Sequence, residues 1–588
     1  MANSQPTGKE QNPAPAPVFD LPGLLELSAT MAHEHRVAFA QSFASAVVLA
    51  LRARSLVSAA PAAPLDLAEQ RKAETIAAAI AELPAAEATR IIGGVYTALL
   101  PESVRARHGI FYTPPALVEC LLDMAAEAGL DWKTARVLDP ACGGGAFLVG
   151  VAQRMMRALN GADPAVILRS LKARLKGFDI DPFGAWLAQA MVAIALDPIA
   201  RAAGRMAPVL TETRDSLELR QDEAGRWDLV VGNPPYGRVS LPPHRRAMYA
   251  RSIYGHANLY AIFTEAALHW VKKGGVVGFL TPPSMLSGLY YKALRGLLAS
   301  EAPPLAVNFV SERDGVFADV LQETMLATYR KGGVAIRGTV GFIDAGQHGL
   351  KRPRRSGSFK LPEQPQSPWL LPRTPAQEHL ARRLRSMPYR LADYGYAVST
   401  GPLVWNRHKR QFRENRGTTC HPVVWAEAVS SDGRFLWRSQ RRNHLPWFAA
   451  ERPKDDWLIV TQPCVLLQRT TAKEQSRRLI AAVLPEEFIR QHGGVIVENH
   501  LNMVRARDGN PGVPPAVIAA LLNSAAADAA FRCINGSVAV SAFELEELPL
   551  PGPAAMMRLA RLVAAHAPSA AIDTSLAAAY GRDYAAAA

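Results

Sequence analysis

The sequence predicts an α/β protein in which a mostly parallel sheet, covered by helices on both faces, forms the central part of the chain. Between residues 113 and 330, short apolar runs alternate with amphipathic stretches. The runs are continuously apolar, as in strands that are buried on both faces of a sheet. A helical, alanine-rich segment precedes this part, and a region rich in tryptophan and arginine follows it. We therefore expect a Rossmann-like α/β domain between a helical N-terminal segment and a C-terminal mixed α+β domain.

The composition is that of an ordinary globular protein with an excess of positive charge. The 588 residues are 49% hydrophobic and carry a formal net charge of +14, which allows a large core and several domains. Between Lys351 and Arg442 there are 19 Lys and Arg against 6 Asp and Glu, so this stretch alone contributes +13. It is either a solvated basic face or linker, or a surface that binds phosphates.

The cysteines and the N-terminus bear on the cellular compartment. The five cysteines have neither metal-ligand nor disulfide-framework spacing, so we expect no metal site and a reducing, cytoplasmic environment. The first residues lack the pattern of a signal peptide. No sufficiently long uncharged apolar run predicts a membrane span.

Each expected element follows from its local pattern. The apolar positions of "DLAEQRKAETIAAAIAEL" recur every three or four residues, which predicts helices before residue 105. Strands are expected at residues 135–139, 175–180, 207–213, 227–233, 274–282, 305–310 and 324–330, with helices between them at 115–129, 163–175 and 258–273. The predicted domains are a disordered leader (1–17), a helical segment (18–105), an α/β domain (106–345), a basic proline-rich linker (346–375), an α+β domain (376–553) and an alanine-rich tail (554–588).

A glycine-rich turn follows the first expected strand. The three consecutive glycines of "DPACGGGAFL" (139–148) let a ligand approach the main chain, although a plain tight turn has the same composition. Because the strand ends at Asp139, a carboxylate lies where it would repel a phosphate. A ligand with an ammonium group or other hydrogen-bond donors suits this turn better.

Acidic residues also follow the next two strands. Asp179 ends the second strand, where an acid can hold the two hydroxyls of a ribose, and Asp181 is expected to cap the following helix. Asp215 follows the third strand and would accept a hydrogen bond from an adenine amine. Three acids beside a glycine turn therefore predict a pocket for S-adenosylmethionine, an adenosine with a cationic amino-acid tail.

The fourth strand ends in the sequence Asn233-Pro234-Pro235-Tyr236. The side-chain oxygen of Asn233 and the carbonyl of Pro234 are two acceptors that the prolines hold rigidly. Two acceptors that hold both hydrogens of a planar amine turn its lone pair toward an electrophilic methyl group. Tyr236 offers a face on which the base that carries the amine can stack. A strand that simply ends in a turn would explain neither the second proline nor the aromatic ring.

In this order, "DPACGGG", "FDIDP", "DSL" and "NPPYG" resemble the motifs of amino-methylating DNA methyltransferases. "GIFYTPPALVECLLDMA" (109–125) resembles the segment that precedes their first strand. With that segment first and a large recognition region last, the chain is similar to the gamma subgroup, the Eco57I- and TaqI-like N6-adenine DNA methyltransferases of restriction-modification systems. The resemblance is strong over residues 105–335 and looser over 385–553. It implies methyl transfer from S-adenosylmethionine to the N6 amine of an adenine flipped out of the duplex.

The resemblance also assigns roles to single residues. It implies that the cofactor is bound by Tyr112, Thr113, Pro114, Asp139, Ala141, Gly143, Gly145, Asp179 and Asp215. It implies that the target amine is bound by the catalytic set Asn233, Pro234, Pro235 and Tyr236, and that the flipped base stacks on Tyr236 and Phe317. Simple core burial would also explain Phe317. No metal is implied.

The C-terminal region carries the expected DNA contacts. In residues 399–417 and 433–448, aromatic side chains alternate with Arg, Lys and Asn, as in surfaces that contact phosphates and base edges, although ordinary exposed strands look similar. The candidate DNA-binding residues are Arg407, Lys409, Arg410, Arg441 and Arg442. The expected partner is double-stranded DNA, and a cognate restriction endonuclease would be encoded separately. We expect a monomer without membrane association.

Three other functions remain open on the same residues. The N-P-P-Y corner also occurs in release-factor methyltransferases, whose target is a protein glutamine amide, but the basic second domain would then be unexplained. An RNA base is the next alternative. A DNA-binding subunit that has lost methyl transfer is the third, and the intact residues 233–236 argue against it.

Overall fold

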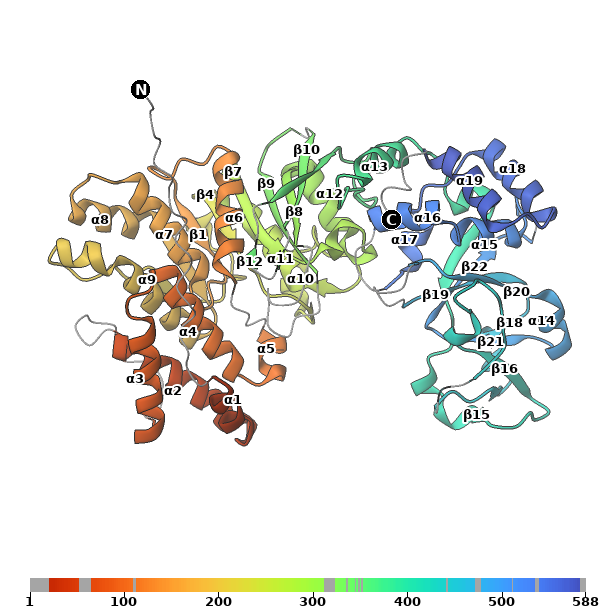
Figure 1. Ribbon diagram of the computed structural model, residues 1–588, viewed down its shortest axis with the longest axis horizontal. Helices are drawn as coiled ribbons and strands as arrows, with labels where there is room; N and C mark the ends of the chain where they lie inside the picture. The colour runs from red at the N-terminus through yellow and green to blue at the C-terminus, as the bar shows by residue number, and fades with distance from the viewer. Residues whose placement is uncertain are drawn as a thin grey trace, which may run out of the picture. The chain divides into compact units, whose positions relative to one another are not determined.

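Figure 1 shows the chain as a computed structural model. The structure describes residues 21–51, 65–108, 113–310, 323–334, 337–343, 345–346, 349–350, 353–439, 441, 443–470, 477–509, 511–534 and 539–581. The chain divides into two compact units. The first comprises Met1–Leu122, Asp131–Glu218 and Val231–Pro235, and the second Asp123–Leu130, Leu219–Val230 and Tyr236–Ala588.

The first unit begins with the helical segment that the sequence predicts. Its helices are α1 (Leu21–Ala29), α2 (His33–Leu51), α3 (Leu67–Ile80), α4 (Ala85–Leu99) and α5 (Glu102–His108). A capping box starts α3, because Asp66 Oδ1 accepts the Glu69 N–H (2.8 Å) while Glu69 Oε2 accepts the Asp66 N–H (3.1 Å). The ring of Tyr96 in α4 packs against that of Phe183, with centroids 5.0 Å apart. The helical segment therefore supports the α/β part of its unit.

Three parallel strands carry the site of the first unit. They are β1 (Val137–Asp139), β2 (Leu175–Asp179) and β3 (Thr211–Thr213), with β1 paired to β2 and β2 to β3. The helices of this part are α6 (Pro115–Glu127), α7 (Ala146–Ala158), α8 (Pro164–Arg174) and α9 (Pro182–Ala202). Because the strands are parallel, their carboxyl ends lie at one edge, where a Rossmann-like sheet binds its ligand.

The helix α9 is apolar because it is a core helix. Among the described helices it is the one long and apolar enough to cross a membrane by length and composition, and the bent pair of α15 (Pro515–Leu522) and α16 (Ala525–Ile534) passes that test if counted as one span. However, 72% of the apolar window of α9 is buried, and α9 packs on α7, α8, β2 and β3.

The second unit contains a mixed sheet in the strand order β7-β9-β8-β10-β13. These strands are β7 (Val271–Thr281), β9 (Thr324–Arg330), β8 (Pro304–Val310), β10 (Gly338–Ile343) and β13 (Arg354–Phe359). Only β8 and β10 pair in parallel, and the other neighbours are antiparallel. The prediction of a mostly parallel sheet thus holds for β1 to β3 and for the β8–β10 pair, whereas β9 and β13 run antiparallel to their neighbours. Antiparallel neighbours such as β8 and β9 need no crossover helix between them.

Other helices and strands of this unit come before β7 or between β7 and β8 in the sequence. They are β5 (Arg238–Val239), α10 (Pro243–Met248), β6 (Ala257–Asn258), α11 (Leu259–Trp270) and α12 (Lys292–Glu301). The strand β4 (Trp227–Gly232) begins in the second unit and ends in the first. Each strand predicted between residues 135 and 330 is present, with ends that differ by a few residues.

The C-terminal part is mixed α+β, as predicted. One antiparallel sheet has the order β14-β22-β19-β20, formed by Tyr396–Thr400, Leu501–Ala506, Cys464–Gln468 and Ala481–Leu484. A second has the order β15-β17-β16-β21-β18, formed by Phe412–Arg413, Trp447–Ala449, Cys420–Val424, Val495–Val497 and Ile459–Val460. Alternate residues of β19 enter two cores: Val465 packs with the C-terminal helices and Leu466 with residues of the second sheet.

One stretch of the second unit differs from its predicted character, and the tail, which was expected to be helical or frayed, is helical in its described residues. Arg354–Phe359 lies within the predicted linker 346–375 but forms β13 against β10. Its buried residues include Ser356 and Ser358, so the strand lacks the apolar pattern by which strands are recognised. The alanine-rich residues after 553 form α18 (Pro553–Ala564) and α19 (Ser569–Tyr580), whose Met556 and Tyr580 are fully buried. The domain boundaries themselves stay predictions.

The two adjacent methionines of α18 test whether the C-terminal helices belong to the core. Met556 is 0% exposed and Met557 is 57% exposed. Met556→Ala should therefore lower the free energy of unfolding by about 2–4 kcal/mol, whereas Met557→Ala should change it by less than about 0.5 kcal/mol. Urea titration followed by fluorescence measures both. Equal effects of the two substitutions would contradict the packing of α18.

Candidate functional site

The turn between β1 and α7 is fixed by its main-chain contacts. The Cys142 N–H donates to the Phe178 carbonyl of β2 (2.9 Å), and the Gly145 N–H donates to the Cys142 carbonyl (2.7 Å). Gly145 has φ +83°, and a Cβ at this position would lie 2.9 Å from Ala188 Cα of α9. Only glycine meets both conditions without strain. The missing side chain at Gly145 therefore lets the buried end of the turn pack against α9.

Asp139, at the end of β1, is a buried carboxylate. It is 1% exposed, and its Oδ1 accepts the Ala141 N–H (3.1 Å). Burial raises the pKa of Asp139 to about 8, and the negative charge of nearby Asp179 adds to this effect. A carboxylate held in this way gains most from a ligand that brings a positive charge or hydrogen-bond donors.

Asp179, at the end of β2, ties the glycine turn to the second strand. Its Oδ2 accepts the Gly143 N–H (2.8 Å) and its Oδ1 accepts the Asp181 N–H (2.9 Å). Burial raises the pKa of Asp179, against these two hydrogen bonds. Asp181 caps α9 by accepting the Phe183 N–H (3.0 Å), which confirms the cap expected there. Both oxygens of Asp179 keep lone pairs that can accept further hydrogen bonds.

The turn after β3 is fastened to the same edge. Asp215 Oδ1 accepts the Leu217 N–H (2.9 Å), and the buried Ser216 donates its hydroxyl to the Pro140 carbonyl (2.6 Å). Asp215 is thus held close to the turn that begins at Asp139. Ser216 is part of the "DSL" motif. Its hydrogen bond to Pro140, 76 residues away in the sequence, leaves no pattern from which it could be predicted.

The end of β4 contacts Asp139 directly. A Cβ at Gly232 would lie 2.7 Å from Asp139 Oδ1, closer than carbon and oxygen can approach. Only glycine therefore fits between β4 and this carboxylate. Asn233, which follows, is half-buried, and Pro234 is buried. The corner at 233–235 and the turn at 139–145 consequently form one site within the first unit.

The segment before α6 reaches the same corner. Asn233 Nδ2 donates to Oγ1 of the buried Thr113 (3.3 Å). The amide nitrogen donates in this contact, and Oδ1 is the acceptor of the Asn233 side chain. Pro114 stands just before α6, and its carbonyl accepts the Leu117 N–H (3.0 Å).

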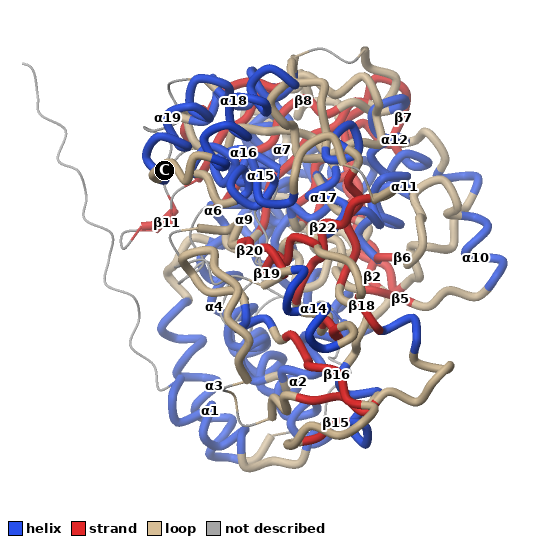
Figure 2. Tube along the Cα trace, turned by 90° about the vertical axis from the view of Figure 1, so that its right-hand side faces the viewer, coloured by secondary structure: helices blue, strands red, loops and turns tan. Residues whose placement is uncertain are grey.

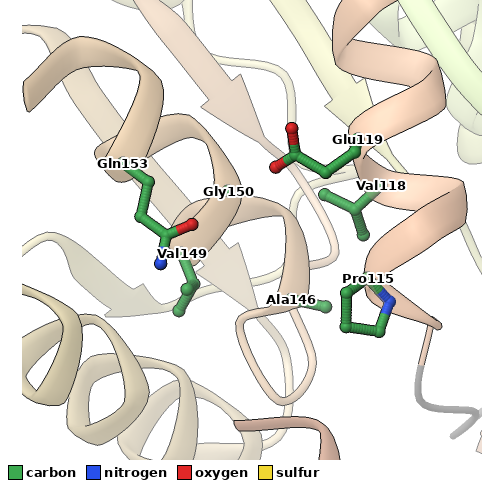
Figure 3. A pocket seen from close by; sticks show the side chains of 7 residues that line it. All are labelled: Pro115, Val118, Glu119, Ala146, Val149, Gly150 and Gln153. Atoms are coloured by element: carbon green, nitrogen blue, oxygen red, sulfur yellow. The ribbon is translucent and has the colours of Figure 1, made fainter. Parts of the chain in front are cut away.

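Helices α6 and α7 hold these two segments side by side. Figure 3 shows the groove between them, lined by Pro115, Val118, Glu119, Ala146, Val149, Gly150 and Gln153. Arg154 of α7 bonds the Glu119 carboxylate across the groove (2.5 Å). Ala146 directly follows Gly145 and Pro115 directly follows Pro114, so the groove begins where the candidate site ends.

Tyr236 belongs to the second unit. It is half-buried, its hydroxyl donates to the Leu280 carbonyl at the end of β7 (3.2 Å), and burial raises its pKa. Its ring meets that of Tyr260 edge to face, with centroids 6.1 Å apart. Tyr260 in turn stacks on Tyr291 and shares a hydrogen bond with Ser284 (2.9 Å). The tyrosine ring is thus fixed by an aromatic cluster that the sequence did not reveal.

Three predicted residues lie outside the described part of the chain. They are Tyr112, Phe317 and Arg442. The other predicted site residues of the first unit lie at the strand ends and loops described above: Thr113, Pro114, Asp139, Ala141, Gly143, Gly145, Asp179, Asp215, Asn233, Pro234 and Pro235.

The predicted DNA-binding side chains lie on the surface of the second unit. Arg407, Lys409, Arg410 and Arg441 are exposed, and the Lys409 amine lies 5.1 Å from the ring centroid of Trp405. Glu427, which we did not predict, holds the loop around Arg441. Its carboxylate meets His444 Nδ1 (3.2 Å) and Arg441 Nε (3.8 Å). Among the described residues, no group of three or more His, Cys, Asp or Glu could hold a metal ion.

Parts of this chain are similar to known proteins. Residues 202–317 match the Eco57I restriction-modification methylase family. The chain is 25% identical over 355 residues to the type II methyltransferase M.BsuBI of Bacillus subtilis, which covers 59% of this chain and 70% of M.BsuBI. It is 24% identical over 255 residues to the adenine-specific methyltransferase PglX of Streptomyces coelicolor, covering 34% of this chain and 21% of PglX. The solved structure of the type IIL restriction-modification enzyme MmeI in complex with DNA shares the fold, with a TM-score of 0.56, 13% identity and 95% of each chain covered.

The raised pKa of Asp139 predicts an unusual pH dependence of stability. The folded protein keeps this carboxyl neutral up to about pH 8, whereas the unfolded chain ionises it near pH 4. Its contribution to stability is therefore complete below pH 4 and is lost as the pH rises toward 8. Asp139→Asn removes this loss and keeps the acceptor for Ala141. It should become more stable than the wild type as the pH rises, by up to about 1.4 kcal/mol per pH unit.

Thermal unfolding of the ligand-free protein between pH 5 and pH 8 measures this difference. Asp131→Asn is the matched control, because hydrogen bonds from the Lys133 N–H and the Thr134 hydroxyl lower the pKa of the exposed Asp131. Its substitution should destabilise the protein instead. A pH-independent difference between Asp139→Asn and the wild type would contradict the burial of a neutral carboxyl.

Proposed function

We propose that this chain, which belongs to the Eco57I-like family of restriction-modification methylases, transfers a methyl group from S-adenosylmethionine to the N6 amine of adenine at specific sites in DNA. One observation carries the proposal: Gly232 brings the corner at Asn233 against Asp139 and hence against the glycine turn. A group bound at the corner and a ligand bound at the turn would then be neighbours.

The donors and acceptors at the turn fit S-adenosylmethionine. The buried carboxylate of Asp139 suits its ammonium group, and the main chain at Gly143, where a Cβ would meet no atom within 4 Å, is open to close approach. Gly145 would shape the turn through its close contact with Ala188. Asp179 has acceptor capacity for ribose hydroxyls, and Asp215 for the adenine amine. Thr113, Pro114, Ala141 and, by resemblance, Tyr112 would complete the wall. When bound, the cofactor supplies an electrophilic methyl group on a sulfonium.

The corner at Asn233 supplies orientation without a strong base. Its Oδ1 and the carbonyl of Pro234 would accept the two hydrogens of the target amine, so that the nitrogen lone pair points away from the ring. Pro235 keeps the main chain rigid, and Thr113 holds the Asn233 amide in place. Tyr236, fixed by Tyr260, would stack on the base, with Phe317 on its opposite face by resemblance.

Nucleic acid is favoured over a protein amide by the second unit. Arg407, Lys409, Arg410 and Arg441 are exposed, and the Lys409 amine lies 5.1 Å from the ring centroid of the half-buried Trp405. Exposed cations of this kind suit phosphates, and Arg442 would extend the set. Adenine is favoured because the chain is similar to PglX, which is named as adenine-specific. The target adenine would be flipped out of the duplex. The enzyme would act as a cytoplasmic monomer, beside a restriction endonuclease encoded separately.

Asn233→Ala tests the role of the corner. Without the side-chain acceptor, methyl transfer should fall by at least about 100-fold, while the affinity for S-adenosylmethionine should stay near that of the wild type. The assay incubates mixed-sequence DNA with methyl-labelled cofactor and identifies the modified nucleoside and its sequence context. If the wild-type protein methylates RNA or protein but not DNA, the proposal that DNA is the substrate is refuted. Undiminished transfer by the variant would refute the role of Asn233.

Thr113 gives a second test through its hydroxyl. Thr113→Val has the same shape but cannot accept the Asn233 N–H, so turnover should fall about tenfold, the equivalent of one hydrogen bond. Thr113→Ser keeps the hydroxyl and should restore most of the turnover. If valine keeps the turnover and serine loses it, the methyl group of Thr113, and not its hydrogen bond to Asn233, is what matters.

A further inference from the structure

A hairpin directly follows Tyr236 in the second unit. Gly237–Asn258 leaves the body of the unit through β5, forms α10 and returns through β6. Arg238 pairs with Asn258 and Val239 with Ala257, and the Leu259 N–H donates to the Gly237 carbonyl (2.9 Å). Figure 2 shows α10 projecting beyond these two strands. The sequence prediction gave this stretch no function.

The hairpin carries only positive charge. Residues 237–258 include four arginines and two histidines, and no aspartate or glutamate. Arg251 is used within the unit, because it bonds Glu301 (2.5 Å) and lies 4.0 Å from Glu265. Arg238 and Arg246 are exposed. A surface without a carboxylate of its own suits a polyanion.

The hairpin is an ordered structure and not a loose loop. Tyr249, just after α10, is fully buried, and the Ser252 N–H donates to the Glu265 carboxylate of α11 (2.9 Å). Arg246 Nη2 donates to the Gly255 carbonyl (2.8 Å), which closes the hairpin on itself. The main chain of the hairpin and the Arg246 side chain are therefore held in place before any partner binds, which lowers the entropic cost of binding.

Exposed aromatic rings lie beside these charges. Tyr254 is 41% and Tyr290 is 46% exposed. The Lys292 amine lies 3.7 Å from the centroid of Tyr254, and the rings of His256 and Tyr290 lie 4.9 Å apart. Aromatic faces interleaved with cations are typical of surfaces that bind single-stranded or unstacked nucleic acid.

The position of the hairpin gives this surface a specific target. It begins at the residue after Tyr236 and ends two residues before Tyr260, whose ring packs on that of Tyr236. A nucleotide stacked on Tyr236 would thus have its neighbouring phosphates near the base of the hairpin. The surface formed by Arg238, Arg245, Arg246, Tyr254, Tyr290 and Lys292 is separate in sequence from the basic region at 399–448.

We propose that this hairpin surface binds the DNA strand next to the flipped nucleotide, with Arg238 and Arg246 on its phosphates and Tyr254 and Tyr290 against unstacked neighbouring bases. The proposal rests on the proposed function and adds a second contact surface to it. The C-terminal region would select the site, and the hairpin would hold the distorted strand beside Tyr236.

The test compares the double variant Arg238→Gln/Arg246→Gln with a control of equal charge, Arg71→Gln/Lys72→Gln on the exposed face of α3. Binding of a duplex that contains the methylation site is measured over a range of salt concentrations. Loss of two phosphate contacts should lower the slope of log K against log salt by nearly two and weaken binding at least about tenfold at moderate salt. The control should bind like the wild type.

A photo-crosslinking base next to the target adenine locates the contact. It should crosslink to residues 238–258 or to Tyr290 in the wild type, and less in Tyr290→Ala. Any of three results would overturn the hairpin proposal. The hairpin variant could show the salt slope of the wild type, the control could lose as much affinity as the hairpin variant, or the crosslinks could be confined to the C-terminal region. If the wild type itself neither binds nor methylates DNA, the proposed function fails instead, so the two failures are distinguishable.

Discussion

The contact between Gly232 and the Asp139 carboxylate is the constraint on which the site depends. A strand that ended in any larger residue would have to move away from Asp139, because a Cβ at position 232 would lie 2.7 Å from its Oδ1. Asp139 cannot easily yield, since its carboxylate is buried and holds the Ala141 N–H. The same carboxylate therefore fixes two things at once: the shape of the glycine turn and the distance from that turn to Asn233.

Buried charge and rigid main chain work together in this arrangement. Asp139 and Asp179 both have raised pKa values because they are buried, so each carboxyl would lose its proton more readily beside a cationic ligand. The two prolines carry the chain from Asn233, in the first unit, to Tyr236, in the second. The residues that would orient the amine and the ring that would stack on its base are thus joined by a stiff covalent connection.

Much of this was predictable from the sequence, for a definite reason. Continuously apolar strands and acids at their ends are local features, so β1 to β4 and the positions of Asp139, Asp179 and Asn233 could be read directly. Contacts between distant segments have no such signal: the hydroxyls of Thr113 and Ser216, 120 and 76 residues from their partners, were found only in the structure. The antiparallel course of β9 and the strand β13 were missed because short apolar or small-residue stretches do not reveal strand direction. The proposed role of the hairpin at 237–258 was not predicted, because a stretch without aspartate or glutamate is not a recognisable sequence motif.

The most direct measurement of the central claim is methyl transfer to DNA by Gly232→Ala. One added methyl group should displace either Asp139 or Asn233, so turnover should fall at least about 100-fold in a protein that remains folded. Gly94→Ala is the control, because a Cβ at Gly94 in α4 meets no atom within 4 Å, and it should retain full turnover. Wild-type turnover in Gly232→Ala would contradict the account. It would show that the positions of the turn and the corner do not depend on the close contact of Gly232 with Asp139.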